Sequence, residues 1–460
     1  MTIPSHVFRE YDIRGLVGEE LTNDFAMLLG RAYGELAKES NRRTIAVGWD
    51  CRPSSESFAH ALAEGISSEG LDVTLTGMGP TPQLYFSIFQ RSLDGGIQVT
   101  GSHNPSNMNG FKMCLGTITL SAEQIRDLGN RMKRLSELLP AKGPKGHVAM
   151  HDIRQEYIDY LIANSRGHMS GRPLRVVVDA GNGVGGLVGP KVLKALGCQV
   201  DELFCEPDGR FPNHHPDPSV PSNLKTLIDR VRSTKADAGI AWDGDADRIG
   251  VVDEKGSIIY GDMLLLIYAR ALLKEQPGAT VIADVKCSSR LFDDIKKHGG
   301  NPIMWKTGHS LIKGKLRESN GALAGEMSGH IFFKHRFFGF DDALYATCRF
   351  VEILSASSQP CSQLLGDLAP SYSTPELRVD CPEHLKFKIA EGAQTLFPEF
   401  QVSTIDGVRI EFEKGWGLVR ASNTQPVLVM RFEAESLELL ESYQTLVSQR
   451  IEALRAKLAA

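Results

Sequence analysis

Short apolar segments that alternate with helix-periodic segments constrain the fold of this 460-residue chain more than any other feature. Residues 44–48, 175–179 and 280–284 are three such segments, each with the length and composition of a buried strand. Alternation of this kind predicts βαβ units and sheets that are largely parallel or mixed. The sequence therefore predicts an α/β fold for most of its length.

A degenerate repeat accompanies these units. The tetrapeptides DGGI at Asp94, DAGI at Asp237 and NGAL at Asn320 each open a short apolar strand. These strands lead into the polar loops TGSHN, WDGDADR and GEMSGH, and open α/β sheets bind ligands beyond the carboxyl ends of their strands. Three related units with one polar loop each predict one composite cleft, although matches of four residues also arise by chance.

Composition suggests where the domains end. LPAKGPKGH at 139–147 is rich in Pro, Gly and Lys, and SASSQPCSQ at 355–363 is rich in Ser. A chain of this length holds three or four domains, so a further boundary near 250–256 follows from domain size alone. After residue 363, VRIEF and VLVMRFEA predict antiparallel strands, and a closing amphipathic helix is expected from about Ser436.

Charge and hydropathy exclude several classes of protein. The formal charge of −5 and the pI near 6.2 argue against binding to nucleic acid or to anionic membranes. The start of the chain lacks a secretory signal, and the apolar run from Met263 is broken by Arg270 and too short to span a bilayer. The eight scattered cysteines suit free thiols. We therefore expect a cytoplasmic protein without nucleic-acid or membrane partners. A monomer is also expected, although none of these features determines the oligomeric state.

The TGSHNP loop carries a candidate nucleophile. Ser102 follows the apolar run GGIQV and precedes the turn formers Asn104-Pro105 and Asn109-Gly110. This pattern predicts a tight loop at a strand end, with an accessible hydroxyl beside His103, as a nucleophilic or phosphoryl-carrying serine requires. An isolated Ser-His pair is more often an ordinary polar turn, so the assignment depends on the other loops.

The DGDADR loop, Asp243 to Arg248, offers three carboxylates at alternate positions. Hard divalent cations prefer oxygen ligands, so Asp243, Asp245 and Asp247 are predicted to bind one ion. A calcium EF-hand is excluded, because Arg248 stands where the sharp turn needs glycine and because strands flank the loop. A solvated acidic turn is disfavoured, because crowded carboxylates repel one another without a cation.

A glycine-rich segment suggests a different function. Gly181 to Gly186 follows the strand RVVVDA and matches the G-x-G-x-x-G pattern of dinucleotide-binding proteins. An NAD-dependent oxidoreductase that uses this loop is therefore an alternative. That function leaves the Ser102 loop and the aspartate loop without a role, so a structural turn between strand and helix is favoured.

Two further loops carry groups that suit a sugar phosphate. GEMSGH, which ends at His330, combines a carboxylate, a hydroxyl and an imidazole, and these suit vicinal sugar hydroxyls and proton transfer. RASNT, which begins at Arg420, is rich in donors for a phosphate. Together the four loops predict one site with a phosphoryl carrier, a metal, a sugar-binding group and a phosphate anchor.

Six motifs in order, YDIRG (11–15), TGSHNP, HHPDP (214–218), DGDADR, GEMSGH and RASNT, show a family resemblance. Over essentially its whole length the chain resembles the α-D-phosphohexomutase family, most closely its bacterial phosphomannomutase/phosphoglucomutase branch. The resemblance implies four domains around a central cleft: three related α/β domains with mixed sheets and a smaller α+β C-terminal domain. On this chain we expect them at 1–147, 148–252, 253–362 and 363–460.

The resemblance implies an isomerase that interconverts hexose 1-phosphate and hexose 6-phosphate, with mannose or glucose as the sugar. Ser102 would be carried as phosphoserine, and Mg²⁺ would be held by Asp243, Asp245, Asp247 and a phosphoryl oxygen on Ser102. The intermediate would be a hexose 1,6-bisphosphate, with glucose or mannose 1,6-bisphosphate as activator. A phosphoglucosamine mutase of the same family is the alternative, which the methionine at Met327 disfavours.

The resemblance also implies roles for other residues. Arg14 and Arg248 would stabilise the transferring phosphoryl group, and Lys112, His103, His309 and His330 are candidates for proton transfer. The substrate would be bound by Tyr11, Lys286, Thr307, Gly308, His309, Glu326, Met327, Ser328, Gly329 and His330. Its other phosphate would be bound by Arg420, Ala421, Ser422, Asn423 and Thr424. One position departs from the family: Ala246 replaces a usual glycine, at a cost of roughly 1 kcal/mol if its φ is positive.

Overall fold

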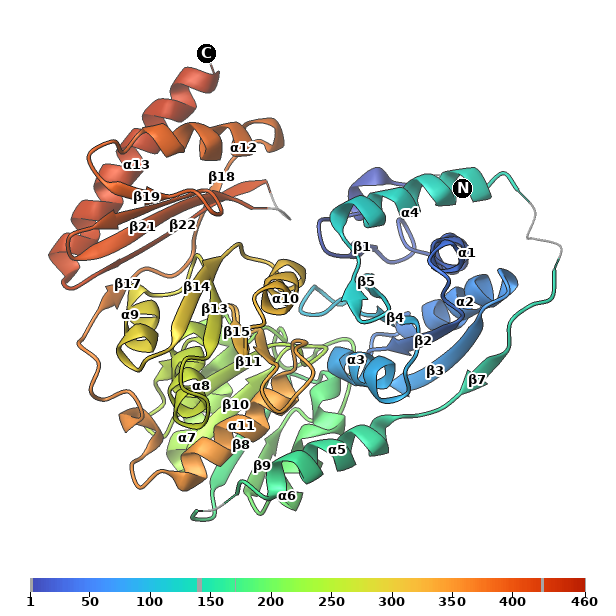
Figure 1. Ribbon diagram of the computed structural model, residues 1–460, viewed down its shortest axis with the longest axis horizontal. Helices are drawn as coiled ribbons and strands as arrows, with labels where there is room; N and C mark the ends of the chain where they lie inside the picture. Colours follow the sequence, from blue (N-terminus) through green and yellow to red (C-terminus); the bar gives the residue numbers. More distant parts are fainter. Residues whose placement is uncertain (1–2, 139–142, 170, 423–425, 460) are drawn as a thin grey trace. The chain divides into compact units, whose positions relative to one another are not determined.

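The computed structural model describes residues 3–138, 143–169, 171–422 and 426–459 (Figure 1). The chain divides into two compact units that are interleaved in sequence. Unit 1 consists of Met1–Leu264 and Ser328–Leu364, and unit 2 consists of Leu265–Met327 and Leu365–Ala460.

The first sheet of unit 1 is mixed, with the order β1-β5-β4-β2-β3-β7 and with β6 paired to β5. Its strands are β1 (Ile13–Leu16), β2 (Thr44–Trp49), β3 (Asp72–Met78), β4 (Gly95–Val99), β5 (Met108–Leu115), β6 (Ile118–Thr119) and β7 (Val148–Met150). Its helices are α1 (Asn23–Glu39), α2 (Ser55–Ser68), α3 (Thr81–Gln90) and α4 (Ala122–Leu135). β5 is antiparallel to both β1 and β4, so the loop after β4 reverses the chain within the sheet.

The second sheet of unit 1 has the order β12-β11-β10-β8-β9. Its strands are β8 (Arg175–Asp179), β9 (Gln199–Leu203), β10 (Ala238–Trp242), β11 (Ile249–Asp253) and β12 (Ile258–Ile259). Unit 1 also contains α5 (Arg154–Arg166), α6 (Gly189–Ala195), α7 (Lys225–Thr234), β16 (Ile331–Phe333) and α11 (Ala343–Ala356). Its 3-10 helices are Ser5–Val7, Val184–Leu187, Pro221–Leu224 and Cys361–Gln363. β10 is buried along its whole length, as expected for an apolar strand with both faces covered.

The sequence repeat corresponds to a repeated structure. Asp94, before β4, donates its backbone N–H to Thr44 O at 2.8 Å, and Asp237, before β10, donates to Arg175 O at 2.7 Å. Each aspartate also accepts the N–H of that same residue on its carboxylate. In the third copy, Ala322 N donates to Thr280 O at 2.9 Å. In this third tetrapeptide the donor is the third residue rather than the first, so the hydrogen bond supports the predicted repeat for the first two units only.

The N-terminal part of unit 2 is a parallel β-sheet with helices. Strand β13 (Thr280–Asp284) pairs in parallel with β14 (Asn301–Trp305) and with β15 (Leu323–Gly325). The helices are α9 (Ser289–Lys297), α10 (His309–Glu318) and α8 (Gly261–Glu275), which contains the boundary between the units. Within the described residues, no helix has both the length and the apolar character needed to cross a membrane.

The C-terminal part of unit 2 is an antiparallel sheet with the order β17-β22-β21-β20-β19, and β18 also pairs with β22. The strands are β17 (Tyr372–Ser373), β18 (Leu377–Asp380), β19 (Gln401–Ser403), β20 (Val408–Phe412), β21 (Gly415–Ala421) and β22 (Val427–Ala434). The helices are α12 (Glu383–Gly392), α13 (Leu437–Ala459) and the 3-10 helix Ala393–Thr395. The predicted antiparallel strands and closing helix are confirmed.

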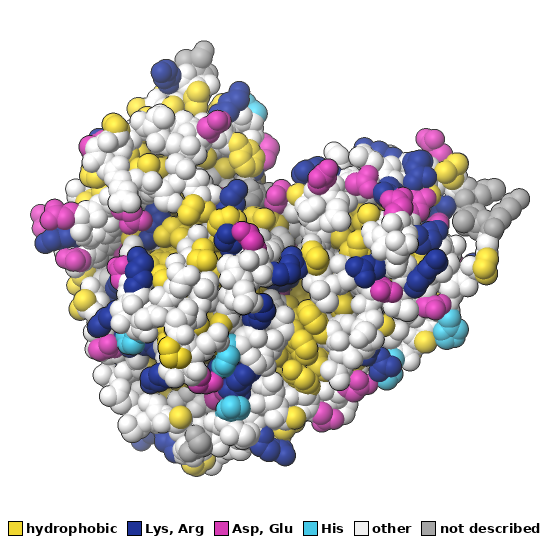
Figure 2. All heavy atoms as spheres, viewed as in Figure 1, with side chains coloured by type: hydrophobic (Ala, Val, Ile, Leu, Met, Phe, Trp, Pro, Cys, Tyr) yellow, Lys and Arg dark blue, Asp and Glu magenta, His cyan; other side chains and the backbone are white. Residues whose placement is uncertain are grey.

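Acidic and basic side chains are interspersed on the surface over α1 and α4 (Figure 2). Arg131 of α4 binds both carboxylate oxygens of Glu39 on α1 at 2.7 Å, and Arg134 binds Glu35 at 2.5 Å. Exposed ion pairs of this kind contribute little to stability. The two helices are therefore held mainly by the buried face that includes Phe25 and Leu128.

Candidate active site

Ser102 lies in the loop between β4 and β5, with φ 49° in the left-handed region. Its Oγ donates to Asp243 Oδ2 at 2.9 Å and lies 3.2 Å from His103 Nδ1. The predicted loop is present, but the prediction of an accessible hydroxyl is wrong, since only 1% of Ser102 is exposed. The side chain is buried because the loop folds inward onto the aspartate loop of the second sheet.

Two residues that the sequence did not single out hold the serine loop. The Arg52 guanidinium donates to four backbone carbonyls of the loop, those of Ser102 (2.9 Å), Asn104 (2.6 Å), Pro105 (2.6 Å) and Met108 (2.8 Å). Asp50 accepts from Arg52 Nε, Thr100 Oγ1 and Gly101 N. Arg52 and Asp50 are both buried, so the pair forms a rigid internal support for Ser102.

Arg14 supports the same loop from β1. Its Nη1 donates to Gly101 O at 2.5 Å and to Asn104 Oδ1 at 2.9 Å, and its Nε donates to Asp12 at 2.8 Å. Tyr11, a second predicted site residue, is half-buried in the bend just before β1. Burial of His103 lowers the pKa of its imidazole well below the usual value, and the nearby positive charges of Arg248 and Arg14 lower this pKa further.

The DGDADR loop connects the antiparallel strands β10 and β11, and its three aspartates are fully buried. Asp243, Asp245 and Asp247 can each direct one oxygen to a common point, since these oxygens lie within 4.8 Å of one another. Ala246, at the turn, has φ 56°. The positive φ that would favour glycine there is therefore present, and alanine adopts it at a cost of about 1 kcal/mol.

The ammonium group of Lys112, on β5, lies within this carboxylate cluster. It donates to Asp245 Oδ2 at 2.6 Å and to Asp247 Oδ2. Although burial opposes ionisation, Lys112 holds the pKa of Asp245 below its usual range. Burial and the other two aspartates raise the pKa of Asp243 well above its usual value. The cluster therefore carries more negative charge than one ammonium balances, and it suits a further cation.

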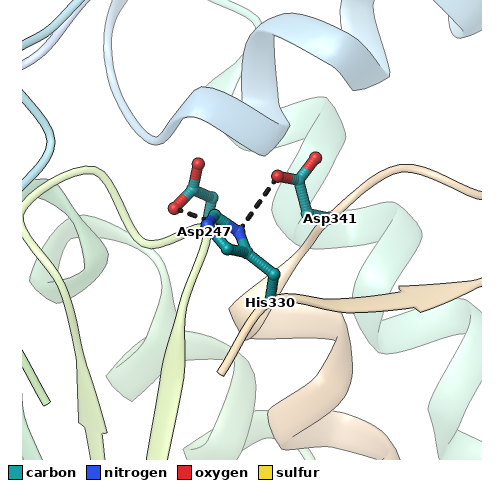
Figure 3. Close-up of side chains that lie close together, drawn as sticks. All are labelled: Asp247, His330 and Asp341. Atoms are coloured by element: carbon teal, nitrogen blue, oxygen red, sulfur yellow. Dashed lines mark ion pairs between the residues drawn. The ribbon is translucent and has the colours of Figure 1, made fainter. Parts of the chain in front are cut away.

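His330 is buried next to the aspartate loop and faces two carboxylates (Figure 3). Arg248 Nε donates to His330 Nε2 at 2.9 Å. On the other side of the ring, His330 Nδ1 lies 3.1 Å from Asp341 Oδ2 and 3.6 Å from Asp247 Oδ1. Two predicted site residues, Arg248 and His330, are thus in direct contact. Asp341 lies next to His330 as well, although no sequence motif pointed to it.

Unit 2 holds most of the residues that are predicted to bind the sugar. Gly308 N donates to Glu326 Oε1 at 3.1 Å, which joins the start of α10 to the GEMSGH loop. His309 is buried at the same helix start. Lys286 Nζ donates to Glu376 Oε1 at 2.7 Å, and despite burial this carboxylate raises the pKa of the lysine. Lys286 is therefore a buried cation near the candidate sugar-binding residues.

The candidate phosphate anchor is at the end of β21. Arg420 Nε donates to Asp406 Oδ2 at 3.0 Å, and the same oxygen accepts the N–H of Thr307 at 3.1 Å. Ala421 and Ser422 are buried beside Arg420. The predicted residues Asn423 and Thr424 lie outside the described residues. Asp406 therefore links the anchor to the segment that carries Thr307 and Gly308.

The predicted site residues fall into two groups. Unit 1 brings together Arg14, Ser102, His103, Lys112, Asp243, Asp245, Asp247, Arg248 and His330, and it also contains Tyr11, Ser328 and Gly329. Unit 2 contains Lys286, Thr307, Gly308, His309, Glu326, Met327, Arg420, Ala421 and Ser422. Each unit is thus a partly assembled site, and the composite cleft formed by both units remains a prediction.

The glycine-rich segment 181–186 has a structural explanation. A side chain at Gly186 would meet Cys205 O at 2.0 Å, and one at Gly183 would meet Gly244 O at 2.6 Å. Asn182 accepts a hydrogen bond from Asn213 at 2.7 Å. Because protein backbone occupies the space beside these glycines, they are required for packing, as the favoured interpretation of a structural turn predicts.

Four family models match consecutive parts of the chain. Models described as phosphoglucomutase/phosphomannomutase alpha/beta/alpha domains I, II and III match residues 5–138, 155–256 and 260–372. The model of the C-terminal domain of the same family matches residues 376–449.

Individual proteins are similar over almost the whole chain. A phosphomannomutase/phosphoglucomutase of Pseudomonas aeruginosa is 45% identical over 460 residues, covering 99% of this chain and 98% of its own. A phosphoglucomutase of Neisseria meningitidis is 46% identical over 447 residues, covering 96% of each chain. The crystal structure of a phosphoglucomutase/phosphomannomutase family protein from Burkholderia thailandensis has a TM-score of 0.91 at 41% identity, covering 99% and 98% of the two chains.

Proposed function

The chain belongs to the α-D-phosphohexomutase family, and on that premise we propose that it is an isomerase that interconverts hexose 1-phosphates and hexose 6-phosphates. Its high similarity to phosphomannomutase/phosphoglucomutase makes mannose and glucose the expected sugars. The observation that carries the proposal is the contact of Ser102 Oγ with Asp243 at 2.9 Å, in a cluster that also holds Lys112 and Arg248. A hydroxyl at this position can carry a phosphoryl group amid groups that neutralise it.

Ser102 is the phosphoryl carrier in this proposal. In the first step a free sugar hydroxyl forms an O–P bond to the phosphoryl group, the bond to Ser102 Oγ breaks, and a hexose 1,6-bisphosphate results. In the second step the other phosphate of that bisphosphate returns to Ser102. Arg14, Arg248 and Lys112 lie close enough to the serine loop or the aspartate cluster to stabilise the charge on the transferring group.

The expected cation of the site is Mg²⁺, which would be held by Asp243, Asp245 and Asp247 together with the phosphoryl group on Ser102. The three buried carboxylates fit a hard cation, because each offers an oxygen within 4.8 Å of the others and because Lys112 leaves part of their charge unbalanced. When bound, Mg²⁺ supplies positive charge next to the phosphoryl oxygens.

The GEMSGH loop and residues of unit 2 bind the sugar and its other phosphate. Glu326 and Ser328 face the sugar hydroxyls, with Lys286, Thr307 and His309 around them. Arg420, Ser422, Asn423 and Thr424 grip the phosphate that is not reacting, and a guanidinium fork is well suited to this. Because the sugar must bind in two orientations, the same residues accept both, and a glucose or mannose 1,6-bisphosphate serves as activator.

Intact-mass measurement tests the proposal. After incubation with glucose 1,6-bisphosphate and Mg²⁺, we expect a stable gain of one phosphoryl group on wild type and none on Ser102→Ala. Ser102→Ala should also lose nearly all conversion of glucose 1-phosphate to glucose 6-phosphate while it still binds the substrate. Retention of more than a few per cent of the turnover would contradict the phosphoserine assignment, and rapid release of inorganic phosphate by wild type would identify a phosphatase instead.

A substrate comparison separates this proposal from its alternative within the family. We expect turnover with glucose and mannose 1-phosphates to exceed turnover with glucosamine 1-phosphate. The reverse preference would assign the chain to the phosphoglucosamine mutases.

A further inference from the structure

The two ring nitrogens of His330 face opposite kinds of group. Nε2 receives a hydrogen bond from Arg248 at 2.9 Å, whereas Nδ1 is next to the carboxylates of Asp341 and Asp247 at 3.1 and 3.6 Å (Figure 3). The ring is 3% exposed and stacks on Phe332, with their centroids 6.2 Å apart. The ring is therefore held by a hydrogen bond at Nε2 and by packing on one face, with two carboxylates next to Nδ1.

These contacts determine which nitrogen carries the proton. An arginine guanidinium has only donors, so Nε2 must be the acceptor in its contact with Arg248. The neutral imidazole then carries its proton on Nδ1, the nitrogen that faces two acceptors. The same logic argues against a metal ion at Nδ1 in this arrangement, because a metal ligand needs the lone pair there.

Asp341 is the carboxylate best placed to maintain this tautomer. It is fully buried, and the backbone around it is held by the isolated bridge between Phe332 and Asp341. Asp247 also faces Nδ1, but it is farther away and already accepts from Lys112 on its other oxygen. The adjacent Asp342 points elsewhere, to the start of α11 and to Tyr157.

We propose that Asp341 is a positioning residue for the mutase reaction: it keeps the proton of His330 on Nδ1, so that Nε2 is the nitrogen that accepts the proton of the reacting sugar hydroxyl. The inference rests on the proposed function. As the hydroxyl oxygen bonds to phosphorus, the hydroxyl proton passes to Nε2. The bond from phosphorus to Ser102 Oγ breaks, and Oγ leaves with the bonding electrons and takes up a proton from Lys112, whose ammonium lies in the aspartate cluster that Oγ contacts. Asp341 then faces the positive charge on the ring, as the carboxylate of a Ser-His-Asp triad does.

Arg248 completes the arrangement because it occupies Nε2 when no substrate is present. For the hydroxyl to reach Nε2, the guanidinium must move off the ring, and a phosphoryl group is a stronger partner for arginine than a neutral imidazole. Arg248 therefore covers Nε2 of His330 until a phosphoryl group attracts its guanidinium.

A double-mutant cycle tests whether Asp341 acts through His330. We expect Asp341→Asn to lower kcat about 10²-fold, with KM within about threefold of wild type. His330→Ala should lower kcat at least as much. The double variant should be no slower than His330→Ala alone, because the carboxylate has no function without the ring. Multiplied losses in the double variant, or unchanged kcat in either single variant, would overturn the proposal.

Asp342→Asn is the matched control, since it changes the neighbouring aspartate in the same way without touching the ring. We expect its kcat to stay within about threefold of wild type, although its thermal midpoint should fall. Equal losses of kcat in both asparagine variants would indicate a structural effect and would overturn the positioning role.

Nitrogen NMR of ¹⁵N-histidine-labelled full-length enzyme with Mg²⁺ observes the tautomer itself. Among the 13 histidines, the His330 signals are those missing from His330→Ala. Wild type should show a protonated Nδ1 and an unprotonated Nε2, and Asp341→Asn should shift toward a mixture; the opposite tautomer in wild type refutes the inference. A wild type that interconverts no hexose phosphates would instead refute the proposed function, whatever the tautomer.

Discussion

Lys112 occupies part of the carboxylate cluster that we assign to Mg²⁺. Its side chain is 2% exposed, and the two aspartates that it binds are fully buried. Three buried carboxylates without a cation would repel one another and destabilise unit 1. The ammonium supplies this charge from within the chain, so the fold of the site does not depend on the metal.

We expect removal of the metal to leave wild type stable but to destabilise Lys112→Met. The buried aspartates of the variant lose the ammonium that donates hydrogen bonds to two of them, so chelation by EDTA should lower its free energy of unfolding by about 3–5 kcal/mol relative to wild type. Thermal unfolding with EDTA and with Mg²⁺ measures the difference. Lys225→Met, which breaks an exposed pair with Asp229, is the control. An equal response to EDTA in wild type and Lys112→Met would contradict this role.

The buried arginine under the serine loop leads to a second expectation. Arg52→Lys keeps the charge but cannot reach four carbonyls at once, and each buried carbonyl left without a donor costs about 1–3 kcal/mol. The loop should then hold Ser102 less rigidly, and phosphoryl loading from glucose 1,6-bisphosphate should slow at least tenfold. A time course of intact mass measures the rate, with the exposed Arg210→Lys as control. Loading at the wild-type rate would show that the support is not needed.

At the scale of elements, the N-cap of α11 is Asp342, a buried carboxyl group whose protonation changes the stability of the protein. Asp342 accepts from Leu344 N and Tyr345 N, and Tyr157 donates to it at 2.6 Å. Burial nevertheless raises the pKa of the Asp342 carboxyl to about 7. An acid with a higher pKa in the folded state binds more protons there, so its contribution to stability is complete below about pH 4 and is lost as pH rises toward 7.

Asp342→Asn should therefore weaken the pH dependence of stability. Asparagine can cap α11 and accept from Tyr157, but it does not ionise. We expect the loss of thermal midpoint relative to wild type to be largest near about pH 5 and to shrink toward about pH 8. Thermal scans across this range measure the trend, with the exposed Asp152→Asn near the start of α5 as control. A loss that grows with pH would contradict the raised pKa.

The elements were predictable where one local pattern determined them. The strands at 175–179 and 280–284 have the predicted bounds, because their apolar runs end in polar residues that cannot continue a buried strand. The aspartate cluster was predictable for a similar reason, since its three carboxylates are within five residues.

Contacts between distant segments were not predictable. Arg52 is 50 residues from Ser102 in sequence, and Arg248 is 82 residues from His330. Asp341 and Asp406 are single carboxylates without a motif, and only the folded chain brings them to an imidazole or a guanidinium. The burial of Ser102 also depends on a second sheet, which the composition of its own loop does not reveal.

At the scale of the whole molecule, the two units should respond separately to a mutation. Within unit 2, the buried Arg409 donates to Val285 O and Cys287 O at 2.7 Å and lies 3.8 Å from the centre of the Trp416 ring. The guanidinium thus joins the antiparallel sheet to the end of β13. Its loss leaves two buried carbonyls without this donor, at a cost of several kcal/mol.

We expect Arg409→Ala to loosen unit 2 and to leave unit 1 unchanged. Hydrogen exchange read by mass spectrometry should show lost protection in β13 and β21, with wild-type protection in β8 and β10. Arg378→Ala, at a side chain that is 59% exposed on β18, is the control. An equal loss of protection in both units would show that they unfold as one body.

The interleaving of the units in sequence has a consequence for synthesis on the ribosome. Trp242, at the end of β10, donates its indole N–H to Thr347 of α11 at 2.9 Å, so the second sheet needs a helix that is made about a hundred residues later. Domains that are continuous in sequence fold as they emerge, N-terminal first. Here the sheet that carries the aspartate loop must wait, with an apolar face uncovered, while residues 265–327 of the other unit are translated. We expect the nascent chain to be prone to aggregation during that interval.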